Sequence, residues 1–138
     1  MDIYTETSIN LFSGYGGFDL ALRLAGIESR TVCYVEWDKY CQQVIQARIK
    51  DGVLDDAPIW DDVREFDGTP WRGRVDIITA SPPCQPYSQA GKLRGADDDR
   101  NLFPDTLRII GEIQPRRVYV ENVPGLNVRS KDGRPAYG

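Results

Sequence analysis

The chain has 138 residues, of which 28% are charged, with a formal net charge of −4 and a pI of about 4.8. That length suits one domain with a real core. The acidic balance, without a long basic run, argues against a chain that tracks a phosphate backbone by itself. No segment is apolar enough to span a membrane and no signal peptide is apparent, so we expect a cytoplasmic protein without membrane contacts.

Runs of β-branched and apolar residues alternate with helically spaced apolar residues from one end of the chain to the other. Strands are predicted at residues 9–12, 30–35, 58–60, 75–79 and 117–120, and helices at 19–25, 40–49 and 102–113. Gly26 stands where the first helix needs a left-handed residue to end. Strictly alternating strands and helices predict a parallel α/β sheet with right-handed crossovers.

A glycine-rich turn connects the first strand to the first helix. Its sequence is Ser13-Gly14-Tyr15-Gly16-Gly17-Phe18. Glycines at this place let a ligand approach the backbone closely, beside the free N–H groups at the start of a helix. The same turn could also be an ordinary tight connection, so it indicates a ligand site only together with other features.

An acidic segment follows the second predicted strand, roughly 20 residues beyond the glycine turn. It consists of Glu36, Trp37 and Asp38. An acid at this distance is the usual hydrogen-bond partner of a ribose, and the Trp37 indole offers a flat face to an adenine. The alternative is that Glu36 and Asp38 only open the next helix, where acidic side chains are favourable.

Cys84 lies in a proline-rich loop directly after the predicted strand at residues 75–79. The chain has no histidine, so neither a Cys-His catalytic pair nor a zinc site with histidine ligands can form. Cys33, Cys41 and Cys84 show no C-x-x-C spacing, so neither a metal site nor a disulfide framework is indicated. Either Cys84 is a small buried apolar residue, or it attacks a substrate without help from histidine.

Taken together, these segments resemble the ordered sequence motifs of the cytosine-C5 DNA methyltransferases, which use S-adenosylmethionine. The matching segments, between about residues 9 and 126, are Phe12-Ser13-Gly14-Tyr15-Gly16-Gly17, Glu36-Trp37-Asp38, Asp62-Val63, Pro83-Cys84-Gln85, Arg100-Asn101-Leu102-Phe103 and Glu121-Asn122-Val123. The resemblance implies a Rossmann-like parallel sheet of the methyltransferase type, incomplete at its C-terminal edge. Residues 1–126 would be the amino-terminal part of the catalytic domain, and residues 127–138 a tail that begins a truncated segment.

The resemblance also implies how Cys84 and Glu121 would act. The Cys84 thiolate would add to carbon-6 of cytosine while Glu121 contacts ring N3 and the exocyclic amine, and carbon-5 would then accept the methyl group. The target base must leave the duplex to reach such a pocket. Without the motif around it, Glu121 could equally be a solvated acid at a strand end.

Further site residues follow from the same resemblance. The backbone near Phe12, Gly14 and Gly16 would hold the methionine end of the cofactor, with Glu36 on the ribose and Trp37 on the adenine face. The remaining expected cofactor contacts are Gly17, Phe18, Asp62, Val63 and Leu102, of which Asp62 and Val63 meet the adenine edge and Leu102 could instead be a helix core residue. Expected substrate contacts are Pro83, Gln85, Ser88, Asn122 and Val123. Residues 85–100 would close over the substrate or form an ordinary solvated loop.

Two departures from the family pattern shape the expectations. Asn10 stands where an aspartate is more common, and the later arginine motif, the target-recognition region and the final cofactor-side helix have no counterpart. We therefore expect weak binding of S-adenosylmethionine or its product S-adenosylhomocysteine, and no methylation of DNA by this chain alone. A partner chain or a homo-oligomer would complete the enzyme. A tRNA methyltransferase, or a non-catalytic cofactor- or partner-binding module, remains an alternative.

Overall fold

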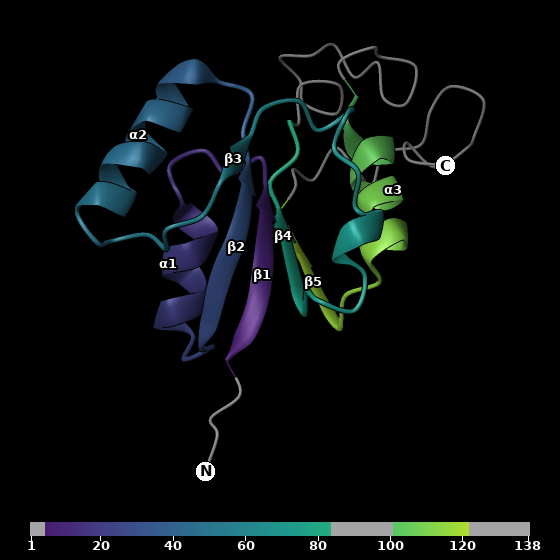
Figure 1. Cartoon of the computed structure of the whole chain (residues 1–138), viewed down its shortest axis with the longest axis horizontal. Helices are drawn as coiled ribbons and strands as arrows, with labels where there is room; N and C mark the ends of the chain where they lie inside the picture. The colour runs from purple at the N-terminus through teal and green to yellow at the C-terminus, as the bar shows by residue number, and fades with distance from the viewer. Residues whose placement is uncertain (1–4, 84–100, 122–138) are drawn as a thin grey trace.

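The computed structural model describes residues 5–83 and 101–121 and shows a parallel sheet between two layers of helices (Figure 1). Within these residues the sheet has five strands in the order β3-β2-β1-β4-β5, and every neighbouring pair is parallel. The strands are β1 (Glu6–Leu11), β2 (Ser29–Val35), β3 (Ile59–Trp60), β4 (Ile77–Ala80) and β5 (Arg117–Val120). This arrangement confirms the fold class expected from the sequence.

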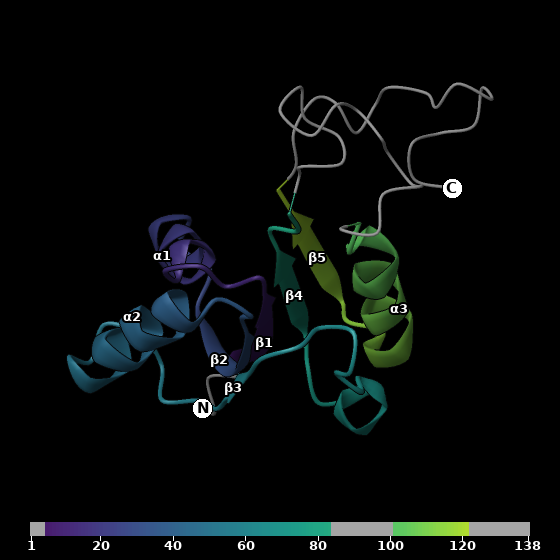
Figure 2. The same ribbon diagram turned by 90° about the horizontal axis from the view of Figure 1, so that it is seen from above.

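The helices divide between the two faces of the sheet, as the view from above shows (Figure 2). Helices α1 (Gly17–Leu24) and α2 (Lys39–Lys50) cover one face, and α3 (Phe103–Ile113) covers the other together with the short 3-10 helix η1 (Thr69–Trp71). The first helix ends as predicted, because Gly26 has φ +74° just beyond its last turn. Among the elements of the described residues, only η1 has no counterpart in the sequence prediction.

Apolar side chains fill the space on both faces of the sheet. The larger cluster lies under α3 and consists of Ile9, Leu11, Cys33, Val35, Val63, Phe66, Val75, Ile78, Ala80, Ile109 and Ile113. The smaller one lies under α2 and consists of Tyr34, Ile45, Leu54 and Ala57. Strand β4 is covered on both faces, and all four of its residues, Ile77–Ala80, are buried, as expected for a parallel sheet. Strand β1 instead alternates apolar Ile9 and Leu11 with buried polar Ser8 and Asn10.

A buried polar cluster ties α1 to the sheet. Asp19 is only 6% exposed and accepts hydrogen bonds from Asn10 Nδ2 at 2.6 Å and from the Thr31 hydroxyl. The pairing of β1 with β2 skips Val32, and this bulge turns Thr31 toward Asp19. Burial raises the pKa of Asp19 above its ordinary value, while the bonds from Thr31 and Asn10 oppose that rise.

The apolar residues of α1 do not all face the core. Leu20 and Leu24 have the helical spacing seen in the sequence, yet they are 43% and 90% exposed, and the buried positions of α1 are Asp19 and Leu22. A stripe of leucines therefore lies on the surface of this helix. Within the described ranges, no helix combines the length and apolar character needed to cross a bilayer.

Candidate functional site

The site lies at the carboxyl ends of β1, β2 and β4, where the order of the sheet reverses. The chain crosses from β1 to β2 on one side and reaches β4 on the other side of β1, which makes this edge a topological switch point. Phe12 follows β1 directly and has φ +54°, a conformation that is uncommon for a residue with a side chain. Such backbone strain gathers at ligand sites, where the surrounding structure maintains it.

Two glycines of the turn adopt left-handed conformations. Gly14 has φ +55° and Gly16 has φ +83°, and a Cβ atom on Gly16 would lie 2.8 Å from both Leu54 methyl carbons. Gly14 has open space beside it. Packing against Leu54 therefore requires glycine at position 16. At Gly14 no atom lies close, so the backbone there stays accessible to a ligand.

The Glu36 carboxylate holds the glycine turn in place. It is 9% exposed, its Oε2 accepts the Gly14 N–H at 2.6 Å, and its Oε1 accepts the Asp38 N–H at 2.9 Å. The acid after the second strand thus lies beside the turn, as the sequence spacing suggests. Both carboxylate oxygens keep lone pairs that a ribose hydroxyl could use.

Asp38 has a different role from Glu36. Its side chain accepts the Cys41 backbone N–H at 2.9 Å and caps α2, so here the helix-opening interpretation is confirmed. The backbone hydrogen bond from Cys41 holds the pKa of Asp38 below its ordinary value.

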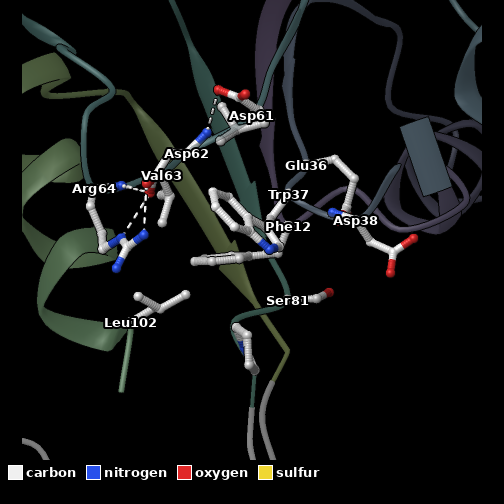
Figure 3. Close-up of a pocket in the computed structure, with 12 residues that line it drawn as sticks. Phe12, Glu36, Trp37, Asp38, Asp61, Asp62, Val63, Arg64, Ser81 and Leu102 are labelled. Atoms are coloured by element: carbon white, nitrogen blue, oxygen red, sulfur yellow. Dashed lines mark hydrogen bonds and ion pairs between the residues drawn. The ribbon is translucent and has the colours of Figure 1, made fainter. Parts of the chain in front are cut away.

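A cavity of about 690 Å³ brings most of the predicted cofactor residues together (Figure 3). This volume is in the usual range for a small-molecule site. Its lining contains Phe12, Val35, Glu36, Trp37, Asp38, Asp61, Asp62, Val63, Arg64, Ser81, Pro83 and Leu102. Leu102 also packs against the larger apolar cluster, which confirms its interpretation as a core residue, while its contact with a cofactor stays a prediction. Glu36 and Trp37 come from the end of β2, and Asp62 and Val63 follow β3.

Arg64 is a member of this cavity that sequence reasoning missed. Its Nε and Nη2 donate to the two Asp62 carboxylate oxygens at 2.9 and 2.8 Å, and its backbone N–H donates to Asp62 Oδ1 at 3.0 Å. The Arg64 side chain lowers the pKa of the Asp62 carboxyl. The Arg64 Cζ atom also lies 5.7 Å from the centroid of the Trp37 ring, within cation–π range.

A second cavity, of about 360 Å³, connects the glycine turn to Glu121. Its lining contains Phe12, Ser13, Gly14, Gly17, Phe18, Ala21, Ser81 and Glu121. The Ser81 hydroxyl donates to Glu121 Oε2 over 3.3 Å. Because Phe12 and Ser81 line both cavities, the space beside Glu121 adjoins the larger cavity. Gly16 belongs to neither lining.

Several predicted residues cannot be placed. Cys84, Gln85, Ser88, Asn122 and Val123 lie outside the described residues, although Pro83 and Glu121 border them. The two cysteines that are described are poor nucleophiles, because burial raises the pKa of Cys33 to about 11 and also raises the pKa of Cys41.

A parallel sheet with a glycine turn after its first strand, an acid after its second and a cavity between them is the arrangement of the S-adenosylmethionine-dependent methyltransferases. The chain belongs to the family of C-5 cytosine-specific DNA methylases, whose family model matches residues 7–134. S-adenosylmethionine is the cofactor of this family.

The sequence is similar to bacterial type II methyltransferases. It is 36% identical over 120 residues to M.NgoMIV of Neisseria gonorrhoeae, which covers 87% of this chain and 36% of that protein. It is 39% identical over 116 residues to M.HhaI of Haemophilus parahaemolyticus, covering 83% of this chain and 33% of that one. The chain thus spans about a third of the length of these relatives.

Solved structures share the fold. Dnmt2 methyltransferase of S. pombe matches 94% of this chain and 38% of its own, with a TM-score of 0.67 and 22% identity. The Spodoptera frugiperda DNMT2 mutant matches 88% of this chain and 36% of its own, with a TM-score of 0.65 and 24% identity. At this identity the likeness concerns the fold.

Proposed function

We propose that this chain forms the cofactor-binding and reaction-initiating part of an enzyme that methylates carbon-5 of cytosine in DNA. The observation that carries the proposal is the pair of adjoining cavities. One contains the predicted cofactor residues Glu36, Trp37 and Asp62, the other contains Glu121, and Phe12 and Ser81 belong to both. Transfer of a group requires that donor and acceptor meet across such a boundary.

The larger cavity fits a nucleoside. The Glu36 carboxylate supplies acceptors for vicinal hydroxyls, the Trp37 ring supplies an aromatic face, and the Asp62 carboxylate can accept from an exocyclic amine. Phe12 lines both cavities, and the glycine turn that follows it, with Gly14, lines the second one. When bound, S-adenosylmethionine would supply an electrophilic methyl group on its sulfonium.

The chain's own residues would activate the base. The Cys84 thiolate would form a bond to carbon-6, and the electron pair of the carbon-5–carbon-6 double bond would move to carbon-5. Carbon-5 would then bond to the methyl carbon as its bond to the sulfonium breaks, which would leave S-adenosylhomocysteine as a neutral thioether. Loss of the carbon-5 proton restores the double bond and breaks the sulfur–carbon bond, so the cysteine leaves as a thiolate. A thiol titrates near 8.5 in water, so Cys84 must be stabilised as its anion to react quickly.

Glu121 would hold the base during this addition. Its carboxyl group faces the second cavity beside the glycine turn, where it can contact ring N3 and the exocyclic amine of a cytosine. The Ser81 hydroxyl, 3.3 Å from Glu121 Oε2, would orient that carboxyl group. Pro83, Gln85, Ser88, Asn122 and Val123 complete the proposed set of substrate contacts.

The recognition of DNA would depend on more than these 138 residues. The aligned region covers only 36% of M.NgoMIV, and the net charge of −4 is unfavourable for holding a phosphate backbone. We propose that a partner chain or a second copy contributes the missing contacts. The proposed compartment is the cytoplasm, where a reducing environment keeps Cys84 as a free thiol.

A trapping experiment tests the proposal. DNA containing 5-fluorocytosine has no carbon-5 proton to lose, so the adduct with Cys84 should persist through denaturing electrophoresis. We expect a cofactor-dependent adduct with the enzyme assembled from this chain and its partner, and none with Cys84→Ala. A Cys41→Ala variant is the matched control and should behave like the unchanged protein. An adduct that survives in Cys84→Ala would refute the assignment.

A tRNA substrate is the second candidate, because the tRNA-methylating branch of the family has a similar run to residues 81–86. Parallel assays with a labelled methyl donor, using DNA in one arm and tRNA in the other, separate the two substrates. Label in tRNA alone would replace DNA by tRNA in the proposal. Cofactor binding without label in either arm would favour a non-catalytic module.

A further inference from the structure

We propose that Arg64 is a positioning residue of the adenine subsite, which fixes the Asp62 carboxylate and the Trp37 ring relative to one another. The inference rests on the proposed function, because it assigns a task to the cavity that would hold the adenosyl group. Asp62 and Trp37 follow different strands, and the described contacts between them pass through the Arg64 guanidinium.

The geometry of the ion pair sets the direction of the Asp62 lone pairs. Two guanidinium nitrogens meet two carboxylate oxygens, which holds the plane of the carboxylate in one orientation. The Arg64 backbone N–H adds a third bond to Oδ1. Oδ2 accepts one described bond, so it keeps the capacity to accept an adenine 6-amino group.

The contact with Trp37 places the same guanidinium at the aromatic wall of the cavity. Trp37 is 65% exposed, so the protein core does little to fix its ring. The Arg64 Cζ lies 5.7 Å from the ring centroid, and both side chains line the cavity (Figure 3). A planar base needs about 3.5 Å on each side for van der Waals contact, so it cannot insert between them as they stand. The base must instead use the remaining face of the indole while Arg64 supports it.

The charge of Arg64 matters less than its shape. The Arg64 and Asp62 side chains are 60% and 15% exposed, so solvent screens much of their attraction. A lysine would retain the charge but lose the planar fork that matches a carboxylate. The proposal therefore predicts that Arg64→Lys loses most of what Arg64→Gln loses.

The test measures selectivity for the 6-amino group. S-adenosylhomocysteine and its deaminated analogue S-inosylhomocysteine, which carries a 6-oxo group, are titrated by calorimetry into the unchanged chain, Arg64→Gln and Arg64→Lys. We expect Arg64→Gln to bind S-adenosylhomocysteine about three- to tenfold more weakly. The analogue should lose less affinity, so the selectivity ratio falls. Arg72→Gln is the matched control, because the Arg72 guanidinium donates to backbone carbonyls of α3 outside the cavity.

A double-mutant cycle isolates the route of the effect. If Arg64 acts through Asp62, Arg64→Gln should change the selectivity ratio in the unchanged chain and leave it unaltered in an Asp62→Ala background. Equal losses for both ligands, or an unaltered ratio in Arg64→Gln, would overturn the positioning role. Failure of the unchanged, folded chain to bind S-adenosylhomocysteine at all would instead contradict the proposed function. Thermal unfolding without ligand checks that each variant is folded.

Discussion

The Gly14 backbone N–H donates to Glu36 Oε2 over 2.6 Å, and this bond joins the glycine turn to the end of the neighbouring strand. Two segments 22 residues apart in the sequence are thereby held as one surface. The acid has two tasks in our interpretation: it orders the turn and it offers lone pairs to a ribose. Variants at Glu36 can separate these tasks.

We predict that Glu36→Ala weakens the binding of S-adenosylhomocysteine at least tenfold. The substitution leaves the Gly14 and Asp38 N–H groups without their acceptor, which should also cost about 1–3 kcal/mol of stability. Glu36→Gln keeps one acceptor oxygen. Its affinity and its stability should therefore lie between those of the unchanged protein and those of Glu36→Ala. Calorimetric titration and thermal unfolding report the two effects separately. Unaltered affinity in a folded Glu36→Ala variant would contradict the ribose assignment.

The second prediction concerns the glycines of the turn. Gly16→Ala should destabilise the protein by about 2–4 kcal/mol, because it combines a left-handed residue with a Cβ atom 2.8 Å from Leu54. Gly14→Ala has the strain without the clash and should cost about 1–2 kcal/mol. Gly17→Ala has neither and should stay within about 0.5 kcal/mol.

Denaturant unfolding measures the stability of the three glycine variants. A second substitution, at Leu54, tests how much of the cost of Gly16→Ala comes from the steric clash. In a Leu54→Ala background the clash disappears, so the cost of Gly16→Ala should fall toward that of Gly14→Ala. An unaltered cost in that background would show that backbone strain alone accounts for Gly16.

How far the sequence could anticipate this structure differs from element to element. The strands and helices were predictable because runs such as Ile77–Ala80 are β-branched and continuous, and turns carry glycine or proline. The described residues of the segments that match the family also come together at one end of the sheet, as expected. Most of these segments directly follow a strand, and parallel strands bring their carboxyl ends to the same side of the sheet.

What the sequence could not show depends on contacts across elements. The leucine spacing of α1 does not reveal that Asp19 faces the sheet, because its partner Thr31 is turned by a bulge at Val32 that no local signal marks. Arg64 looks like one more surface charge, because its contact with the Trp37 ring forms only when the loop after β3 lies beside the end of β2. In both cases a side chain finds its partner only through the register or the loop geometry.

Our third prediction is that stability depends on pH through Asp19. Burial raises the pKa of Asp19 in the folded state, so the folded protein holds this proton more tightly than the unfolded chain. Its favourable contribution is complete below about pH 4 and is lost as the pH rises through the folded-state pKa. In Asp19→Asn this contribution should vanish. Relative to that variant, the unchanged protein should lose stability as the pH rises above about 4.

Urea unfolding at several pH values measures the difference. Asp51→Asn, at the exposed end of α2, is the matched control for the loss of one carboxylate from the surface. A profile that is the same in the unchanged protein and in Asp19→Asn would show that Asp19 does not titrate in this range.

The fourth prediction is that the Ser81 hydroxyl acts in holding the base and not in binding the cofactor. Removing its hydroxyl in Ser81→Ala frees the Glu121 carboxyl group from a 3.3 Å bond. We expect adduct formation with 5-fluorocytosine DNA to slow by about three- to tenfold, because the base is held less well. Affinity for S-adenosylhomocysteine should change less than about twofold, because the described bond of the Ser81 hydroxyl goes to Glu121 and not to a predicted cofactor residue. A parallel loss of cofactor affinity would place Ser81 in cofactor binding instead.

The last prediction concerns the edge of the sheet. Within the described residues β5 is the outermost strand beside β4, and its Val118 and Val120 side chains are 38% and 40% exposed. An apolar edge strand favours pairing with another chain, whereas a lysine there opposes it. We expect the chain to self-associate with rising concentration and Val118→Lys to shift it toward monomer. Leu24→Lys places the same charge on α1, at the more exposed of its two surface leucines, and is the matched control. Sedimentation over a concentration series decides between the surfaces: dissociation by Leu24→Lys alone would assign the contact to α1, and a monomer at every concentration would contradict self-association altogether.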